Sequence, residues 1–187
     1  DGAYLAFDIK EEQVPEFIKA MRLLNMQGCN VTMPCKTAAA QNMDELSPAS
    51  QLIGAVNTIV NRDGKLYGHI TDGEGFVANL KDHGVEVKDK NIVIFGAGGA
   101  ATAIQVQCAL DGAKSITIFN PRDGFFEKAE KMVGKIQDKV PGCQVELYDL
   151  DAKDAMKEKI DAADILVNGT LLGMKPREDT SIINDPD

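Results

Sequence analysis

The 187-residue sequence predicts an α/β protein in which a small α/β domain is followed by a doubly wound parallel sheet. Three observations support this fold class. Strand-like and helix-like segments alternate strictly after about residue 90, the run at 92–95 is continuously apolar, and a glycine-rich turn follows that run. A strand that helices cover on both faces is apolar throughout, and strand–helix alternation with short turns produces a parallel sheet.

The first half contains short elements of both kinds. We expect strands at residues 4–9 and 28–32, and helices at residues 14–24, 36–43 and 47–55. The segment at 14–24 repeats apolar residues at the spacing of an amphipathic helix. The segment at 47–55 begins with Ser47 as a helix cap and Pro48 at the first helical position.

A hairpin and a helix complete this half. Residues 57–70 form two β-rich runs around Asp63-Gly64, a typical hairpin turn. A helix at 76–84 should end at Gly84. We therefore place a boundary near 84–90, with domains at 1–84 and 85–187. In the second domain we expect strands at 92–95, 115–119, 145–150 and 164–168, and helices around 99–111, 125–139 and 152–160.

Composition excludes several classes of protein. The net charge is −9 and Lys and Arg are not clustered, which argues against a nucleic-acid surface. No apolar run approaches the length of a membrane span, and no signal peptide is evident. The spacing of the four cysteines and two histidines does not fit a zinc site, so we expect no metal and reduced cysteines in a cytoplasmic protein. Both ends look cut, because a strand begins almost at once and the final string Asn-Asp-Pro-Asp is loop-like; we expect a fragment of a longer chain.

The glycine turn predicts a dinucleotide site. Gly96, Gly98 and Ala101 form a G-x-G-x-x-A pattern between an apolar strand and a helix. The first glycine permits the tight turn, the second lets a pyrophosphate approach the backbone, and the small third residue permits close packing. The helix then offers free N–H groups to the anion. The alternative is a tight turn whose glycines serve packing alone.

The end of the next strand should contact the adenosine ribose. Asp123 can accept hydrogen bonds from the ribose hydroxyls of NAD, whereas Arg122 can bind the 2′-phosphate of NADP. These neighbours favour opposite cofactors; we expect NAD and leave NADP open. Asp123 can also cap the turn at 124–126, which is compatible with the ribose role. After the fourth strand, Asn168, Thr170 and Leu171 can border the nicotinamide half, or form an ordinary loop.

Polar stretches in the first domain lie where strands or the hairpin end. They contain Thr32 with Lys36, Asn57, and Asp72. Taken singly, Lys36 can be a solvated helix residue, Asn57 a turn residue and Asp72 a helix cap. Taken together, the stretches GCNVTMPCK, GAVNT, GHITDGEG, GAGGAA and NGTLLGM resemble, in this order, the shikimate dehydrogenase family. The segments FNPRDGFFEKAE and NGTLLGMKP are most similar to its quinate/shikimate dehydrogenase branch.

This resemblance implies a function and a set of site residues. It implies an N-terminal substrate domain, incomplete here, a Rossmann domain, and a site in the cleft between them. The expected activity is NAD(P)-dependent oxidation of shikimate or quinate to the 3-dehydro acid, and its reversal, in aromatic amino-acid biosynthesis or quinate metabolism. The implied residues are Lys36 as acid/base with Asp72 as partner, Thr32 and Asn57 at the substrate, Gly96, Ala97, Gly98, Gly99 and Ala100 at the pyrophosphate, and Asn120, Arg122 and Asp123 at the ribose.

The residue types suit this chemistry. Oxidising a secondary alcohol requires a group that removes the hydroxyl proton, and a lysine does so in its neutral form, which burial favours and a nearby carboxylate disfavours. Two departures from the family pattern stand out. Ile70 replaces a usual asparagine, and Pro121 replaces an arginine of the branch, which favours NAD. By the resemblance, a serine pair that holds the substrate carboxylate and a segment that completes the cleft lie outside this sequence.

Two other functions stay open at this point. A methylene-tetrahydrofolate dehydrogenase has a similar layout and also uses a lysine, although the segments 30–36 and 71–73 argue against it. A ligand-sensing module of a transcriptional regulator is the second, and the Lys36 and Asp72 pair argues against that. We expect a monomer or homodimer that binds a small-molecule substrate, neither nucleic acid nor membrane.

Overall fold

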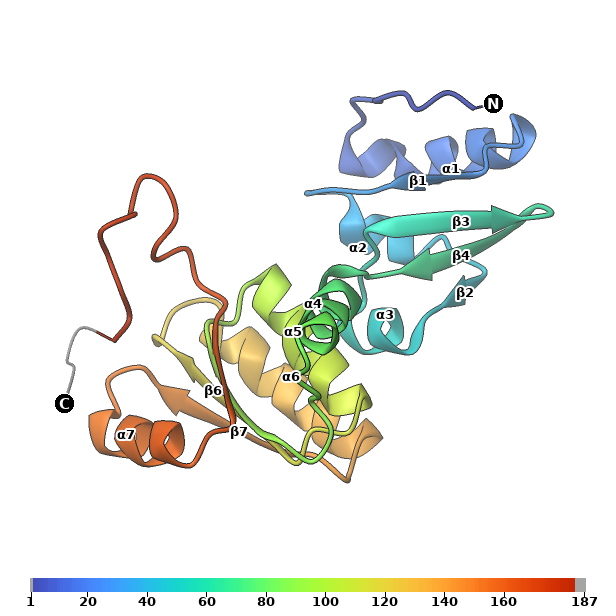
Figure 1. Cartoon of the computed structure of the whole chain (residues 1–187). Helices are drawn as coiled ribbons and strands as arrows, with labels where there is room; N and C mark the ends of the chain where they lie inside the picture. Colours follow the sequence, from blue (N-terminus) through green and yellow to red (C-terminus); the bar gives the residue numbers. More distant parts are fainter. Residues whose placement is uncertain (1, 184–187) are drawn as a thin grey trace. The chain divides into compact units, whose positions relative to one another are not determined.

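The computed structural model describes residues 2–183, so the terminal Asn-Asp-Pro-Asp string lies outside the described residues. The chain forms two compact units, Asp1–Thr71 and Asp72–Asp187 (Figure 1).

The first unit contains a four-stranded mixed sheet in the order β1-β3-β4-β2. Strands β3 (Thr58–Arg62) and β4 (Lys65–His69) form the predicted hairpin, with β1 (Gly28–Asn30) antiparallel to β3 and β2 (Glu45–Leu46) parallel to β4. The hairpin turn has positive φ at Asp63 and Gly64, 52° and 85°, as a tight two-residue turn requires. The helical elements are η1 (Glu11–Gln13), α1 (Val14–Leu23), α2 (Lys36–Ala40) and α3 (Pro48–Ile53).

The core of this unit lies between α1, α2 and the hairpin. Val14, Ile18 and Met21 of α1 pack with Ile59 and Leu66 of the hairpin, and all five are at most 5% exposed. These three positions follow the predicted helical spacing. Ser47 caps the start of α3 as predicted, because its hydroxyl accepts the Ser50 N–H at 3.2 Å. Gly54, with φ of 76°, ends the helix before the predicted end at residue 55.

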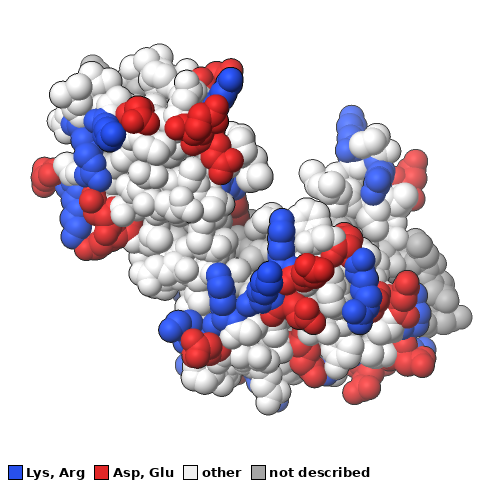
Figure 2. Space-filling view, turned by 180° about the vertical axis from the view of Figure 1, so that it is seen from behind, with Lys and Arg blue, Asp and Glu red and all other residues white. Residues whose placement is uncertain are grey.

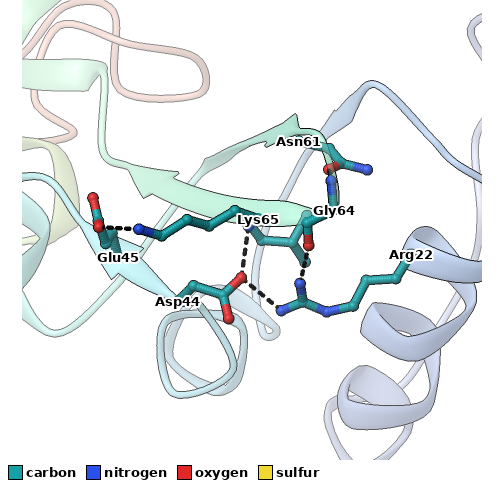
Figure 3. Close-up of polar contacts among 7 residues, drawn as sticks. Arg22, Asp44, Glu45, Asn61, Gly64 and Lys65 are labelled. Atoms are coloured by element: carbon teal, nitrogen blue, oxygen red, sulfur yellow. Dashed lines mark hydrogen bonds and ion pairs between the residues drawn. The ribbon is translucent and has the colours of Figure 1, made fainter.

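A polar network ties the end of α1 to the hairpin (Figure 3). Arg22 donates to a carboxylate oxygen of Asp44 at 2.8 Å and to the carbonyl oxygen of Gly64. The same oxygen of Asp44 accepts the Leu66 N–H at 2.7 Å, and Lys65 pairs with Glu45. The hydrogen bonds from Leu66 N–H and from Arg22 lower the pKa of Asp44, in that order.

The prediction of a strand at residues 4–9 is wrong. This segment has no regular secondary structure and pairs with no strand of the described chain, and Tyr4, Leu5 and Phe7 are more than half exposed. It is held by side-chain contacts instead: the Phe7 and Phe17 rings lie 5.5 Å apart. A short apolar run is a local pattern, whereas a strand also requires a neighbour to share its hydrogen bonds.

The second unit contains a parallel sheet in the order β7-β6-β5-β8. All four strands and the three following helices occur where the alternation predicts them. Their bounds are β5 (Asn91–Phe95), α5 (Gly99–Leu110), β6 (Ser115–Asn120), α6 (Phe126–Lys139), β7 (Gln144–Asp149), α7 (Lys153–Asp161) and β8 (Ile165–Asn168).

Helices cover both faces of this sheet, which confirms the doubly wound fold (Figure 1). Met156 of α7 packs with Phe95 and Phe119, while α5 and α6 lie on the opposite side. Chain order reverses between β5 and β8, since β6 and β7 extend the sheet to one side of β5 and β8 lies on the other. Ligands bind at such a switch point, outside the carboxyl ends of the strands.

Helix α4 (Asp72–Asp82) begins four residues before the predicted start at 76. Asp72 and Glu74 stabilise its first turn, where the helix dipole favours carboxylates, while Gly73 and Gly75 weaken the sequence signal. A Cβ at Gly73 would lie 2.3 Å from the Ala103 carbonyl, so α4 packs closely on α5. The two compact units meet between Thr71 and Asp72. The domains 1–84 and 85–187 stay a prediction.

Basic and acidic side chains are interspersed on the face drawn in Figure 2. Among residues 2–183, no helix has the length and apolar character to cross a membrane, and no group of three or more His, Cys, Asp or Glu side chains is arranged to hold a metal ion.

Candidate active site and dinucleotide site

The glycine turn follows β5 at the switch point of the parallel sheet. Gly96 has φ of 99°, a conformation that glycine adopts without strain, and its N–H donates to the Phe119 carbonyl at 2.8 Å. A Cβ at Gly96 would lie 3.0 Å from the Gly169 carbonyl. Gly98 then caps α5 in an extended conformation. The turn therefore brings the end of β5 beside the end of β6 and the loop after β8.

The space in front of this turn is open. A Cβ at Gly98 or Gly99 would meet no atom within 4 Å, whereas Ala101 is fully buried and close to Gly169. The residues present thus fit a dinucleotide, because Gly99 and Ala100 are exposed at the first turn of α5 and the packing behind them is tight. Ala97 and Ala100 flank the two glycines in the same turn.

Gln105 supports the turn from behind, and the sequence reasoning missed it. Its side chain is fully buried, and Nε2 donates to the Gly96 carbonyl at 2.9 Å. Its Oε1 has no hydrogen-bond partner among the described residues. No sequence signal singled it out, because α5 also carries the polar residues Thr102 and Gln107.

The end of β6 is a hydrogen-bonded turn. Buried Asn120 donates through Nδ2 to the Pro121 carbonyl at 2.7 Å and to Asp123 Oδ1 at 3.0 Å. The same Asp123 oxygen accepts the Phe125 N–H at 2.8 Å. Asp123 therefore caps this turn, as the alternative interpretation expected, while α6 itself begins at Phe126.

Arg122 is part of an ion pair that the sequence reasoning missed. Its Nε donates to Asp149 Oδ2 at 2.8 Å, and its guanidinium carbon lies 4.8 Å from the centre of the Phe126 ring. Asp149 ends β7 and lies opposite Asn120 in the strand register. An acidic residue at the carboxyl end of the adjacent parallel strand was the signal for this contact.

The loop after β8 is held by its own side chains. Asn168 Oδ1 accepts the N–H and the hydroxyl of Thr170, at 3.0 and 2.7 Å, and Asn168 Nδ2 donates to the Leu172 carbonyl. The Gly169 N–H donates to the Phe95 carbonyl at 2.8 Å, which joins this loop to the end of β5. Leu171 is 72% exposed.

In the first unit, Asn57 links the three polar stretches of the sequence. Its Oδ1 accepts hydrogen bonds from the Thr58 hydroxyl at 3.0 Å and from the N–H and hydroxyl of Thr71, at 3.0 and 3.2 Å. Its carbonyl accepts the Val31 N–H at 2.7 Å. One asparagine thus joins the hairpin, the segment that precedes α4, and the segment that follows β1.

Lys36 begins α2, and its backbone is part of the same arrangement. The Val56 N–H donates to the Lys36 carbonyl at 3.1 Å. Thr32 lies in the turn that leads into α2, is exposed, and accepts the Cys35 N–H through its carbonyl at 3.0 Å. The structure therefore brings Thr32, Lys36 and Asn57 into one region of the first unit. Asp72 is exposed and opens α4 in the second unit, and its pairing with Lys36 stays a prediction.

Comparisons with known proteins agree with these motifs. The family model described as the shikimate dehydrogenase substrate binding domain matches residues 1–59. A shikimate dehydrogenase (NADP(+)) of Streptococcus uberis is 48% identical over the whole chain, and one of Listeria monocytogenes is 44% identical. The chain spans 64% of the length of each of these relatives.

Solved structures extend this similarity to the fold. A shikimate 5-dehydrogenase from Listeria monocytogenes, in complex with shikimate and NAD, matches with a TM-score of 0.93 and 44% identity, over 97% of this chain and 63% of that one. A quinate dehydrogenase from Corynebacterium glutamicum in complex with NAD matches with a TM-score of 0.77 and 27% identity, over 91% of this chain and 58% of that one. Over its whole length this chain is similar to shikimate dehydrogenases, and its first 59 residues match the model of their substrate binding domain.

Proposed function

We propose that this chain forms part of an NAD(P)-linked dehydrogenase that oxidises shikimate to its 3-dehydro acid and catalyses the reverse reduction. The observation that carries the proposal is the match over 97% of the chain to a structure that holds shikimate and NAD. The glycine turn at the switch point supports the dinucleotide half of the proposal, because open space faces Gly98 and Gly99. The polar set around Asn57 supports the substrate half.

Lys36 is the proposed acid/base, and Asp72 its partner at the substrate. During oxidation a neutral Lys36 accepts the proton of the reacting hydroxyl, and during reduction its ammonium returns that proton. Thr32 and Asn57 are proposed to contact the substrate hydroxyls and so orient the reacting carbon. Proton transfer of this kind contributes about 10²–10⁴-fold to a rate, and orientation supplies much of the remainder.

The second unit would hold the cofactor. Backbone N–H groups of Ala97 to Ala100 face the pyrophosphate, the residues Asn120 to Asp123 face the adenosine ribose, and Thr170 and Leu171 border the nicotinamide half. When bound, the dinucleotide supplies the two-electron acceptor of the oxidation. The first glycine, Gly96, keeps the turn tight enough for this approach.

Quinate is the second candidate substrate. The match to a quinate dehydrogenase favours it, but that structure is 27% identical, against 44% for the structure that holds shikimate. We therefore propose shikimate as the preferred acid. A place in the cytoplasm and a monomeric or homodimeric state remain predictions from the sequence.

Initial rates with each acid against NAD⁺ and NADP⁺ test the proposal. We expect turnover of shikimate, with quinate slower. A protein that binds a dinucleotide but turns over only a tetrahydrofolate substrate would replace the proposal with the folate enzyme. Binding of shikimate without turnover would instead favour a sensing module.

A further inference from the structure

We infer that Asp149 determines cofactor preference by holding Arg122 in an ion pair, which favours the unphosphorylated ribose of NAD over the 2′-phosphate of NADP. The inference rests on the proposed dinucleotide site. It concerns a residue that neither the glycine pattern nor the ribose-strand pattern singles out.

The two residues meet at the carboxyl edge of the parallel sheet. Arg122 follows β6 and Asp149 ends β7, and the Leu150 N–H joins the two strand ends by donating to the Asn120 carbonyl at 3.1 Å. In dinucleotide-binding folds the adenosine ribose lies at the end of the second strand of the sheet, which is β6 in this unit. Arg122 is therefore the cation placed to receive a 2′-phosphate.

Asp149 is well placed to restrain that cation. Its Oδ1 accepts the Asp151 N–H at 3.1 Å, which fixes the carboxylate, and its Oδ2 accepts Arg122 Nε at 2.8 Å. The Phe126 ring packs against the guanidinium on another side. The Asp149 side chain is 26% exposed and that of Arg122 is 71% exposed, so a partly buried carboxylate holds an exposed arginine.

The local charge also disfavours a phosphate. Asp123 lies next to Arg122 in the sequence, so two carboxylates accompany one guanidinium at this strand end. A 2′-phosphate would have to displace Asp149 from Arg122 or bind beside the negative charge of the Asp149 carboxylate. The hydroxyl of NAD meets no such repulsion and is an ordinary partner for a carboxylate.

Calorimetric binding of NAD⁺ and NADP⁺ tests the inference without requiring turnover. We expect the wild-type protein to prefer NAD⁺. Asp149→Asn, which keeps the side-chain shape, should tighten NADP⁺ binding about fivefold and change NAD⁺ binding less than about twofold, the scale of an exposed ion pair. Arg122→Ala combined with Asp149→Asn should abolish this gain, because the released arginine is its source.

Asp151→Asn is the matched control, because it removes one charge from the same loop while leaving the ion pair in place. Its ratio of NAD⁺ to NADP⁺ affinity should equal that of the wild type. Unchanged or weaker NADP⁺ binding by Asp149→Asn, with normal NAD⁺ binding, would overturn the inference; so would an equal gain in Asp151→Asn or a gain that survives Arg122→Ala. Failure of the wild-type protein to bind either dinucleotide would instead overturn the proposed cofactor site.

Discussion

The backbone carbonyl of Lys36 accepts the N–H of Val56 at 3.1 Å, and Val56 immediately precedes Asn57 in the sequence. The residue proposed to move the substrate proton is thus tied through its main chain to Val56, the sequence neighbour of a residue proposed to contact the substrate. This bond uses no side-chain atom of Lys36. The side chain can therefore be replaced while this link stays intact.

Lys36→Ala should lower kcat for shikimate oxidation by about 10²–10⁴-fold, the usual contribution of a general acid/base. The affinity for NAD⁺ should not change, because the glycine turn belongs to the other compact unit. Initial rates and calorimetry measure the two quantities. Lys19→Ala, an exposed lysine on α1 that pairs with Glu16, is the control and should retain full activity. A loss in kcat smaller than about tenfold would rule out the proposed role.

Asn57→Ala should reduce the free energy of unfolding by about 1–3 kcal/mol, because it leaves the Thr58 and Thr71 donors without their acceptor. It should also raise KM for shikimate. Asn57→Asp keeps an acceptor oxygen and should recover most of the stability. Urea unfolding and initial rates separate the effects. If Asn57→Ala is less stable but has the KM of the wild type, Asn57 has a structural role and does not contact the substrate.

Much of the second unit could be predicted because its signals are local. Continuous apolar strands, helical spacing and the glycine turn each depend on a few neighbouring residues, and all four parallel strands occur where expected. The hairpin at Asp63 and Gly64 was predictable for the same reason.

Features that depend on distant pairing could not be predicted in this way. Residues 4–9 are as apolar as a strand, but whether they pair is decided by strands elsewhere in the sheet. The contact of Arg122 with Asp149 depends on the register of β6 and β7, and the burial of Gln105 depends on how α5 packs behind Gly96. Sequence patterns identified candidate site residues more readily than the side chains that hold them.

Two glycines of one turn should respond differently to the same substitution. Gly96→Ala should lower the free energy of unfolding by about 1–3 kcal/mol, because φ of 99° strains any other residue. Gly98→Ala should leave stability nearly unchanged, since φ is −70° and no atom lies within 4 Å of the new Cβ. That Cβ would instead occupy the space proposed for the pyrophosphate and weaken dinucleotide binding at least tenfold, on the order of 1.4 kcal/mol.

Thermal unfolding and calorimetric binding of NAD⁺ distinguish these effects. Unimpaired NAD⁺ binding by Gly98→Ala would show that the pyrophosphate does not bind at this turn. Full stability of Gly96→Ala would show that the positive φ carries no structural requirement.

Asp44 should make the stability of the first unit depend on pH. The Leu66 N–H and the Arg22 guanidinium lower its pKa in the folded protein, so folding is stabilised while the carboxylate is charged. The contribution is complete above the unfolded-state pKa of about 3.9 and is lost as pH falls through the lower folded value. Asp44→Asn should therefore be less stable than the wild type at pH near 7, and the two proteins should converge in acid.

Urea unfolding over a series of pH values measures this convergence. Arg22→Gln should lose part of the pH-dependent stability, because it removes the arginine that helps to lower the pKa of Asp44 and leaves the hydrogen bond from Leu66 in place. The network in Figure 3 predicts this order, since the backbone donor is fixed by the hairpin while the arginine is partly exposed. A stability difference between the wild type and Asp44→Asn that is the same at every pH would show that the shape of the side chain matters at this position, and that its charge does not.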